Sequence, residues 1–520
     1  MKRLDPATLF DTLAAAHSPT TVHLSRPLDI APDGGTAYGA AGLADLVADT
    51  AGRLAGAGAG PGTTVAVIKD NHWDSTLLAF AAVRVGAVPA PISDHLPPAT
   101  LAVLLDRLRP AVLVTTRAVL KAAADAGVVL RADRTLSIDG PAPGAAALAE
   151  VEPGPSAPRG RAADDPLLIV HTSGTTGVPK LVPHSTATMV RRLIGFEAHR
   201  WPVLSSRPDD TVAAATSYVH GRAFAWTASV LWLRPRAVAI VADHAPAAAE
   251  PFLRAHPPTT LEALPATYVR WQPMAARTDV FRDVRLYIST FDAMHPPAVR
   301  TFLNATTRRR PLWMQGWGQS ETGPLTFRFL TRAAVAARGG RRPTTRDLGH
   351  PVPTRTRLRV VDPHTLRPVP RGEPGLILAR TRALGLGYLG EQERWSAKVR
   401  DGWWNTEDIG ERTRWGGVRV LDREIDAVPG MSCVEIEDIV DDRIPEVLEC
   451  VVLRTPQGPP LPVVATEDGR LDAGEWQRAV RDLPALAPPV VMAWDELPRT
   501  GTGKVRRLEL RRRLVGSPDA

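Results

Sequence analysis

The chain of 520 residues is poor in cysteine, in lysine and in long hydrophobic runs. Its two cysteines, Cys433 and Cys450, provide neither a disulfide framework nor the spacing of a metal site. No run of roughly eighteen uncharged apolar residues occurs, which argues against a spanning helix, and the first residues lack the apolar core of a signal peptide. We therefore expect a cytoplasmic protein without a membrane partner.

Basic residues outnumber acidic ones, 63 against 55, which gives a net charge of +8. Most of the basic residues are arginines, so the setting of each rare lysine is informative. The arginines are scattered, apart from a dense run at 506–513 that is typical of a solvated terminal helix. We expect no nucleic-acid partner, although a nucleic-acid binder stays an alternative that charge alone supports.

The first third of the chain alternates between helical and strand patterns. Apolar residues follow a helical spacing in 41–58 and 73–86, and short apolar runs occupy 65–68, 87–92 and 111–115. Strands that alternate with helices indicate an α/β fold, with a parallel-rich sheet covered by helices.

Length and composition also predict the domain organisation, because 520 residues exceed one ordinary core. Residues 141–161 are rich in Pro, Ala and Gly and predict a linker or an exposed loop. Short β runs and turns predict a β subdomain at about 351–420. We predict a large N-terminal domain, 1–422, and a small, mobile C-terminal α+β lid domain, 423–520.

The strongest local motif is at 171–180, where an apolar strand leads into a loop of glycines and hydroxyl residues that ends in a lysine. Glycines let backbone N–H groups approach a phosphate, hydroxyls add donors, and the lysine adds a point charge. The Gly-Lys-Ser/Thr ending of a Walker loop is missing. The candidate phosphate-binding residues are Thr172, Ser173, Gly174, Thr175, Thr176, Gly177 and Lys180.

This loop resembles the phosphate-binding loop of the adenylate-forming superfamily, which includes acyl- and aryl-CoA synthetases, nonribosomal adenylation domains and luciferases. Further motifs follow in the superfamily's order, and the resemblance covers about residues 36–512. It implies an AMP-forming ligase that activates a small acid as an acyl-AMP and releases pyrophosphate. The implied cofactors are ATP and Mg²⁺, with CoA as a further candidate.

Residues 315–322 resemble the superfamily's aromatic-Gly-x-Thr-Glu segment. The resemblance implies that Trp317 stacks near adenine beside Gly318, that Ser320 contacts the α-phosphate and that Glu321 helps to hold Mg²⁺. One carboxylate together with substrate phosphates is a typical magnesium environment.

Two more segments resemble the ribose and hinge motifs. Residues 387–390 and 401–410 match a stretch in which Asp408 would accept hydrogen bonds from the ribose hydroxyls, with Glu407 in place of the usual glycine. Residues 421–426 resemble the superfamily's Gly-Arg-x-x-Asp hinge segment. The resemblance implies that Arg423 contacts ribose or phosphate and that Asp426 is the hinge residue.

Residues 497–504 resemble the C-terminal Pro-x-Thr-x-x-Gly-Lys loop. In the superfamily its lysine bridges the attacking carboxylate oxygen and the α-phosphate. Lys504 is therefore the main catalytic candidate, together with Glu321 and His220. A positioned cation offsets the repulsion of two anions as charge develops.

The predicted acid pocket departs from the superfamily pattern. Tyr218 and His220 follow the phosphate loop in the chain, and His220 fits the gate near the carboxylate. Phe291 and Asp292 occupy the Gly-Gly-Ala position, and Gly316 completes the candidates. The bulk of Phe291 favours a small or aromatic acid. Asp292 is predicted to meet an amino or hydroxyl group of the substrate, or the adenine amine.

The segment after Arg423 is shorter than is usual where the superfamily forms thioesters, so the acceptor stays open. CoA, the thiol of a separate acyl-carrier protein and a free amine are alternatives. An unusual acid such as nitrite, activated for N–N bond formation, is an alternative to a carboxylic acid. A catalytically silent nucleotide-binding regulatory protein is a further alternative.

Overall fold

The computed structural model describes residues 4–172, 178–292, 294–337, 344–423, 432–456 and 458–516. The chain divides into two compact units. The first comprises Met1–Glu262, Ser320–Gly323 and Arg382–Trp395, and the second comprises Ala263–Gln319, Pro324–Thr381 and Ser396–Ala520. Within the described residues, no helix is both long enough and apolar enough to cross a membrane.

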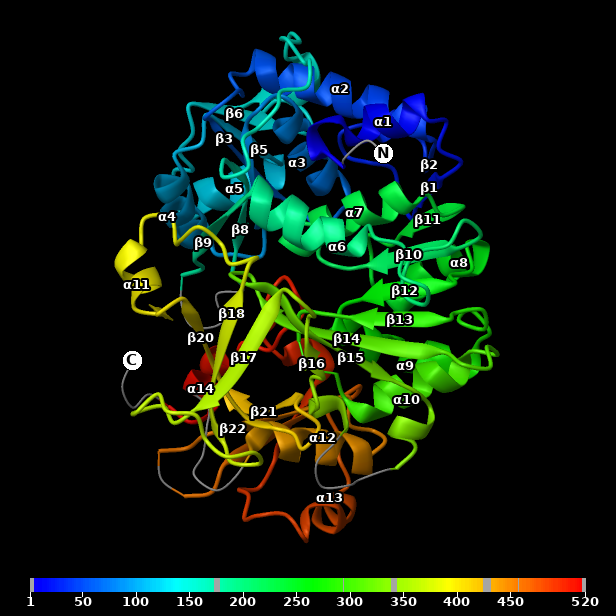
Figure 1. Cartoon of the computed structure of the whole chain (residues 1–520), viewed down its shortest axis with the longest axis vertical. Coiled ribbons are helices and arrows are strands. Elements are labelled where there is room, and N and C mark those ends of the chain that lie inside the picture. The colour runs from blue at the N-terminus through cyan, green and yellow to red at the C-terminus, as the bar shows by residue number, and fades with distance from the viewer. Residues whose placement is uncertain are drawn as a thin grey trace. The chain divides into compact units, whose positions relative to one another are not determined.

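The first unit contains parallel-rich sheets covered by helices, which confirms the predicted α/β class (Figure 1). Its helices are α1 (Leu9–Ala15), α2 (Ala40–Gly56), α3 (Asp74–Arg84), α4 (Pro98–Leu108), α5 (Arg117–Asp125), α6 (Gly195–Glu197), α7 (Gly221–Leu233) and α8 (Pro246–Ala255). Its strands are β1 (Thr21–Leu24), β2 (Ala37–Tyr38), β3 (Thr64–Lys69), β4 (Val88–Ser93), β5 (Val112–Thr115), β6 (Arg134–Ser137), β7 (Ala146–Ala147), β8 (Pro166–His171), β9 (Leu181–Ser185), β10 (Thr211–Ala215), β11 (Ala237–Ile240) and β12 (Thr260–Ala263), whose last residue belongs to the second unit.

One sheet of this unit has the order β4-β3-β5-β6-β7, with each neighbouring pair parallel. In a second group β10, β11 and β1 are parallel, and β2 is antiparallel at the edge. The predicted helices and strands of the first third correspond to α2, α3, β3, β4 and β5, and their ends agree within two residues.

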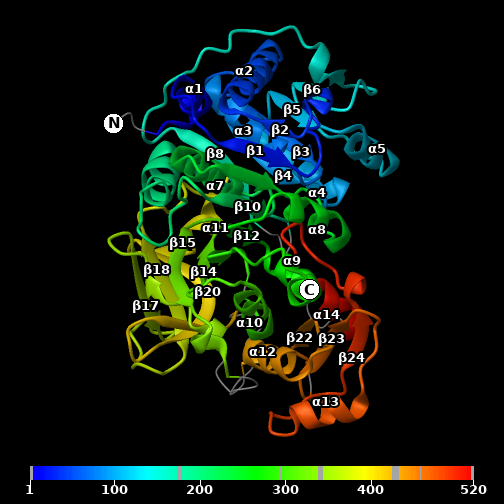
Figure 2. The same cartoon turned by 90° about the vertical axis from the view of Figure 1, so that its right-hand side faces the viewer.

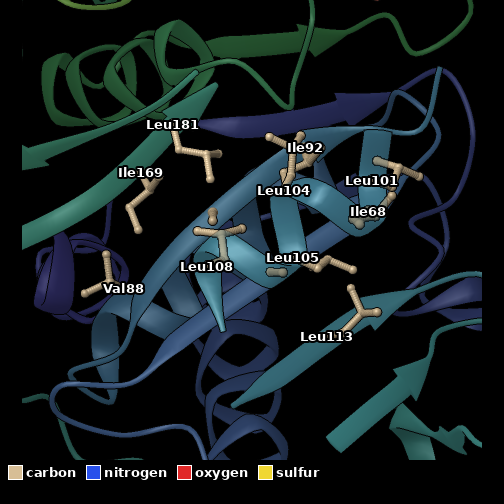
Figure 3. Close-up of a cluster of buried hydrophobic side chains, with 12 residues drawn as sticks. Ile68, Val88, Ile92, Leu101, Leu104, Leu105, Leu108, Leu113, Ile169 and Leu181 are labelled. Atoms are coloured by element: carbon tan, nitrogen blue, oxygen red, sulfur yellow. The ribbon is translucent and has the colours of Figure 1, made fainter. Parts of the chain in front are cut away.

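A cluster of buried side chains fastens the β8–β9 hairpin to the first sheet (Figure 3). Leu101, Leu104 and Leu108 lie on one face of α4, as their helical spacing requires. Ile169 of β8 and Leu181 of β9 belong to the same cluster. Each fully buried leucine or isoleucine contributes roughly 1.5–3 kcal/mol, so the hairpin that carries the predicted phosphate loop has a rigid base.

The predicted linker at 141–161 is largely exposed, as expected, and it is attached to α2. The Gly154 N–H donates to the carbonyl of Gly52 over 2.8 Å. A Cβ atom on Gly56 would lie 1.9 Å from the Glu152 carbonyl oxygen, so only glycine fits there. Two glycines one turn apart on α2 make this approach possible, and the composition of the linker alone does not reveal it.

The second unit combines parallel, antiparallel and mixed sheets. Its complete helices are α9 (Pro265–Arg277), α10 (Pro296–Ala305), α12 (Cys433–Arg443), α13 (Ala473–Val480) and α14 (Arg507–Leu514), while α11 (Gln392–Ser396) begins in the first unit. Its strands are β13 (Leu286–Ser289), β14 (Leu312–Gln319), β15 (Gly323–Leu330), β16 (His350–Pro351), β17 (Thr356–Val361), β18 (Gly375–Thr381), β19 (Val399–Arg400), β20 (Trp403–Arg412), β21 (Val418–Arg423), β22 (Glu449–Leu453), β23 (Leu461–Thr466) and β24 (Val490–Ala493).

Strands β13 and β14 are parallel, whereas β17, β18 and β20 form an antiparallel sheet in which β19 and β21 both pair with β20. This antiparallel sheet occupies the region of the predicted β subdomain. The predicted domain boundary after residue 422 falls at the end of β21.

The last sheet has apolar cores on both faces, with α12, α13 and α14 around it (Figure 2). Cys450 and Val452 of β22 face the core that includes Cys433 of α12, while Val451 and Leu453 face the core that includes Leu510 of α14. This is the two-residue alternation of a strand. Both cysteines are buried thiols outside any disulfide, and burial raises the pKa of Cys450.

A buried ion-pair network fastens α12 inside the second unit. His295 Nδ1, just before α10, lies 2.9 Å from Asp438 Oδ1 and 2.7 Å from Asp441 Oδ2. Arg346 Nε lies 2.5 Å from Asp438 Oδ2, and its Nη2 lies 2.9 Å from Asp438 Oδ1. These are hydrogen-bond distances, and Arg346 binds Asp438 through two nitrogens. We therefore interpret this trio of potential metal ligands as an ion-pair network.

The network makes stability depend on pH. Burial alone would lower the pKa of His295, but the carboxylates of Asp441 and Asp438 outweigh burial and hold this pKa well above 6.5. Because the folded pKa is raised, the contribution of His295 is complete below pH 6.5 and is lost as pH rises through the folded pKa.

We expect the melting temperature of the wild-type protein to exceed that of His295→Gln most at about pH 6, and this difference to shrink toward about pH 10. Circular dichroism melts at a series of pH values measure it. His23→Gln is the control, because burial lowers the pKa of His23 and the sign of its trend is opposite. A His295 difference that grows with pH would contradict the assignment.

Candidate active site

In the first unit, the predicted phosphate loop closes on itself at its two ends. The Thr172 N–H donates to the Lys180 carbonyl, and the Lys180 N–H donates to Thr172 Oγ1, each over 3.0 Å. The β8–β9 register continues directly from this closure, with His171 opposite Leu181. The loop residues Ser173, Gly174, Thr175, Thr176 and Gly177 lie outside the described residues.

Three of the predicted motifs meet at Tyr388. Its hydroxyl donates to Glu321 Oε1 over 2.6 Å, and the Lys180 Nζ lies 5.2 Å from the centre of its ring. Tyr388 and Glu321 are buried, with 2% and 5% of their surfaces exposed. The structure therefore brings together the phosphate-loop lysine, the predicted magnesium ligand and the Gly-Tyr-x-Gly segment.

The backbone around Glu321 is also fixed. The His184 imidazole Nε2 lies 2.8 Å from the Ser320 carbonyl oxygen, and the Gly385 N–H donates to the Glu321 carbonyl over 2.7 Å. Burial lowers the pKa of His184, which favours the neutral ring with its proton on Nε2. Sequence reasoning did not assign a role to His184, because only the fold brings it to residue 320.

The predicted pocket residues of the first unit differ in their surroundings. Tyr218 is buried, its hydroxyl donates to the Ala214 carbonyl over 2.7 Å, and burial raises its pKa well above 10.0. His220 caps α7, since its Nδ1 accepts the Arg222 N–H over 3.1 Å. In the neutral ring the proton is therefore on Nε2, which makes His220 a donor toward an anion.

Arg222 supports the start of α7 through ion pairs with two glutamates, which the sequence alone did not predict. Its Nε lies 2.7 Å from Glu262 Oε1 and its Nη1 lies 2.6 Å from Glu197 Oε1. Glu262 is 1% exposed, so this pair is desolvated. The contacts of Arg222 with Glu262 and Glu197 therefore fix the N-terminus of α7, which His220 caps.

In the second unit, a glutamine holds the predicted ribose-binding aspartate. Gln319 Nε2 lies 2.6 Å from the Thr406 carbonyl and 3.3 Å from Asp408 Oδ2, and Gln319 Oε1 accepts from Trp404 Nε1 over 2.8 Å. Asp408 is opposite Arg423 in the β20–β21 register.

The remaining residues of the aromatic-Gly motif lie on β14. Trp317 packs against the buried side chains of Val360, Ile377 and Val418, and Gly318 follows it on the strand. The predicted hinge residue Asp426 lies outside the described residues.

Phe291 and Glu407 are found where the resemblance leads us to expect glycine. Both have a left-handed backbone, with φ of 80° and 61°. Such a φ costs a non-glycine residue roughly 1–2 kcal/mol. The Glu407 carboxylate lies 2.9 Å from Lys398 Nζ. Phe291 is half-buried, whereas the neighbouring Asp292 is exposed.

Gly316 lies beside the residue that precedes Phe291. A Cβ atom on Gly316 would lie 3.4 Å from Thr290 Cγ2. The two residues follow the last register pair of the parallel strands, Ser289–Gln315, which lies at the carboxyl end of β13 and within β14. Ligands of α/β sheets bind at such ends.

The loop of Lys504 is built as a tight turn. The Thr500 N–H donates to the Lys504 carbonyl over 2.8 Å, and the Lys504 N–H donates to Thr500 Oγ1 over 3.2 Å. Gly503 has a φ of 78°, and a Cβ atom on it would lie 2.8 Å from Ala266 Cβ at the start of α9. The turn therefore packs against α9, and the Lys504 side chain is half-buried.

Comparison with known proteins decides the family. The model of the AMP-binding enzyme family matches residues 13–389. The chain belongs to this family. The predicted resemblance is thereby confirmed, and so is the AMP-forming ligase activity that activates an acid with ATP.

This AMP-binding enzyme has relatives that match it over more than nine tenths of its length. It is 37% identical to the 3-amino-2-hydroxy-4-methoxybenzoate diazotase of Streptomyces cremeus, over 97% of this chain and 94% of the relative. It is 29% identical to the feruloyl-CoA synthase of an Amycolatopsis species, over 92% and 95% of the two chains. The amide bond synthetase McbA of Marinactinospora thermotolerans shares its fold, with a TM-score of 0.77, 20% identity, and coverage of 98% of this chain and 100% of that one.

Proposed function

We propose that this enzyme is a diazotase, which uses ATP to activate nitrite. It then transfers the nitrosyl group to the amine of an aromatic acid such as an aminobenzoate. The observation that carries this proposal is the 37% identity to a diazotase of an aminohydroxybenzoate over nearly the whole chain. The identity to an aryl-CoA-forming relative is 29%. The bulky Phe291 at the Gly-Gly-Ala position also supports a small activated acid.

The reaction balances in three steps. A nitrite oxygen attacks the α-phosphorus of ATP, the bond to pyrophosphate breaks, and a mixed anhydride of nitrite and AMP forms. The aryl amine then attacks the nitrosyl nitrogen, and the N–O bond breaks to release AMP. The resulting N-nitrosamine takes up a proton and loses water, which leaves the aryl diazonium ion.

The enzyme's part is positioning and charge stabilisation. Lys504 would hold the nitrite oxygen against the α-phosphate, and Thr172, Lys180 and Ser320 would bind the phosphates. Asp408 and Arg423 would bind the ribose, and Trp317 would lie against adenine.

Glu321 suits Mg²⁺, because its carboxylate is a hard oxygen donor, and its Oε1 accepts the hydrogen bond of the Tyr388 hydroxyl. When bound, the ion would offset the charge of the leaving pyrophosphate. His220 would donate from Nε2 to an anionic oxygen of the substrate, and Asp292 would receive its amino or hydroxyl group.

A second candidate is activation of the aromatic carboxylate itself as an acyl-AMP, followed by transfer to CoA, to a carrier-protein thiol or to an amine. The similarity to feruloyl-CoA synthase over 92% of this chain favours it. Both candidates share the adenylation site and differ in which group of the aromatic substrate reacts.

Pyrophosphate release and azo coupling distinguish the two candidates. Purified enzyme is incubated with ATP, Mg²⁺ and either an aminohydroxybenzoate or the matched hydroxybenzoate without the amine, each with and without nitrite. We expect release that requires nitrite, and a diazonium ion, trapped as a visible azo dye, that requires the amine as well. Release with the aromatic acid alone, with an acyl-hydroxamate formed in hydroxylamine, would overturn the proposal in favour of acyl transfer.

A further inference from the structure

Tyr388 belongs to the Gly-Tyr-x-Gly segment. In the described structure its side chain contacts two residues that are predicted to bind the nucleotide and its metal, Lys180 and Glu321. Its hydroxyl contacts Glu321, and its ring faces Lys180. Neither the proposed reaction nor the resemblance gives it a role.

The tyrosine cannot turn away easily. The Trp395 ring packs edge-on against it at 5.0 Å between centroids. The flanking backbone pairs with β9, since the Leu386 N–H donates to the Pro183 carbonyl over 2.8 Å and the Leu389 N–H donates to the Leu181 carbonyl over 2.9 Å. The strand that leaves the phosphate loop therefore also holds Tyr388.

We propose that Tyr388 is a positioning residue for the metal–nucleotide complex, which orients the Glu321 carboxylate through its hydroxyl and supports the Lys180 ammonium through its ring. The hydrogen bond to Oε1 restricts the rotation of the Glu321 carboxylate, which would hold the ion when it is bound. The Lys180 ammonium lies over the negative face of the Tyr388 ring, which attracts it and helps to hold it in place. The proposal rests on the predicted role of Glu321 as the magnesium ligand.

Two variants separate these contacts. Tyr388→Phe removes only the hydroxyl, whereas Tyr388→Leu removes the ring as well. We expect Tyr388→Phe to weaken divalent-metal affinity by about 10-fold or more, as partners of metal ligands do when removed. Its KM for ATP at saturating metal should stay near the wild-type value. Tyr388→Leu should raise the KM for ATP in addition.

The direct readout is Mn²⁺ bound to the enzyme in the presence of ATP, measured by electron paramagnetic resonance, with the Mg²⁺ dependence of pyrophosphate release beside it. Tyr287→Phe is the matched control, because Tyr287 is a fully buried tyrosine whose hydroxyl lacks a hydrogen-bond partner within the described chain. It should bind Mn²⁺ like the wild type.

Wild-type Mn²⁺ affinity in a folded Tyr388→Phe protein would overturn the proposal. So would an equal loss in Tyr287→Phe, because the effect would then follow from removing any buried hydroxyl. Mn²⁺ binding is measured without turnover, so a wrong assignment of the acid or the amine leaves this test intact.

Discussion

Lys504→Ala should lower the rate of pyrophosphate release by on the order of 10²–10³-fold, because a preorganised cation that meets charge developing in the transition state is worth that much. The rare lysine stands in a turn that Gly503 fits against α9, so its position is set by the backbone. The affinity for ATP should change far less, since the other predicted phosphate ligands are untouched. Stopped-flow or coupled pyrophosphate assays measure the rate, and equilibrium titration measures ATP binding.

Lys121→Ala is the matched control for Lys504. Lys121 is 75% exposed and pairs with Asp125 one turn away on α5. Its removal should leave the rate unchanged. Lys504→Arg should not restore full activity, because a planar guanidinium presents its donors differently from an ammonium. A Lys504→Ala rate within a few-fold of the wild type would contradict the assignment of this lysine.

Asp438→Ala should lower the free energy of unfolding by about 3–5 kcal/mol, the usual cost of removing one partner from a buried ion pair. The substitution leaves Arg346 without its bidentate carboxylate, and it leaves His295 with one carboxylate instead of two. Urea denaturation, followed by tryptophan fluorescence and circular dichroism together, measures the loss.

Asp482→Ala is the control for Asp438, because Asp482 also pairs with an arginine of α12, Arg443, but is 47% exposed. An exposed pair contributes about 0–1 kcal/mol, so the two variants should differ severalfold. A loss below about 1 kcal/mol in Asp438→Ala would show that the cost of desolvation cancels the attraction in this network.

The elements and motifs that depend on local patterns could be predicted from the sequence. The alternation of β3, α3, β4, α4 and β5 is visible in hydrophobic spacing, and so is the strand before the phosphate loop. The contacts of Tyr388 with Glu321, and of His295 with Asp438, join residues 67 and 143 positions apart. Such pairs depend on the packing of whole elements, which periodicity does not encode.

Two individual residues illustrate the limits of motif order. Tyr218 is at the expected place in the chain, yet its hydroxyl is bonded to Ala214 within the core. Asp292 stays a predicted pocket residue, and its carboxylate is exposed in the structure. Motif order locates a segment, whereas the direction of each side chain depends on the local backbone.

The left-handed backbone at Phe291 and Glu407 bears on how distant members of this family can be detected. At both positions a larger residue is found where the resemblance leads us to expect glycine, and each has a positive φ that glycine adopts without strain. A search pattern that requires glycine letters would reject this chain at both sites. A pattern written in backbone torsions would accept a positive φ at either site, whichever residue adopts it.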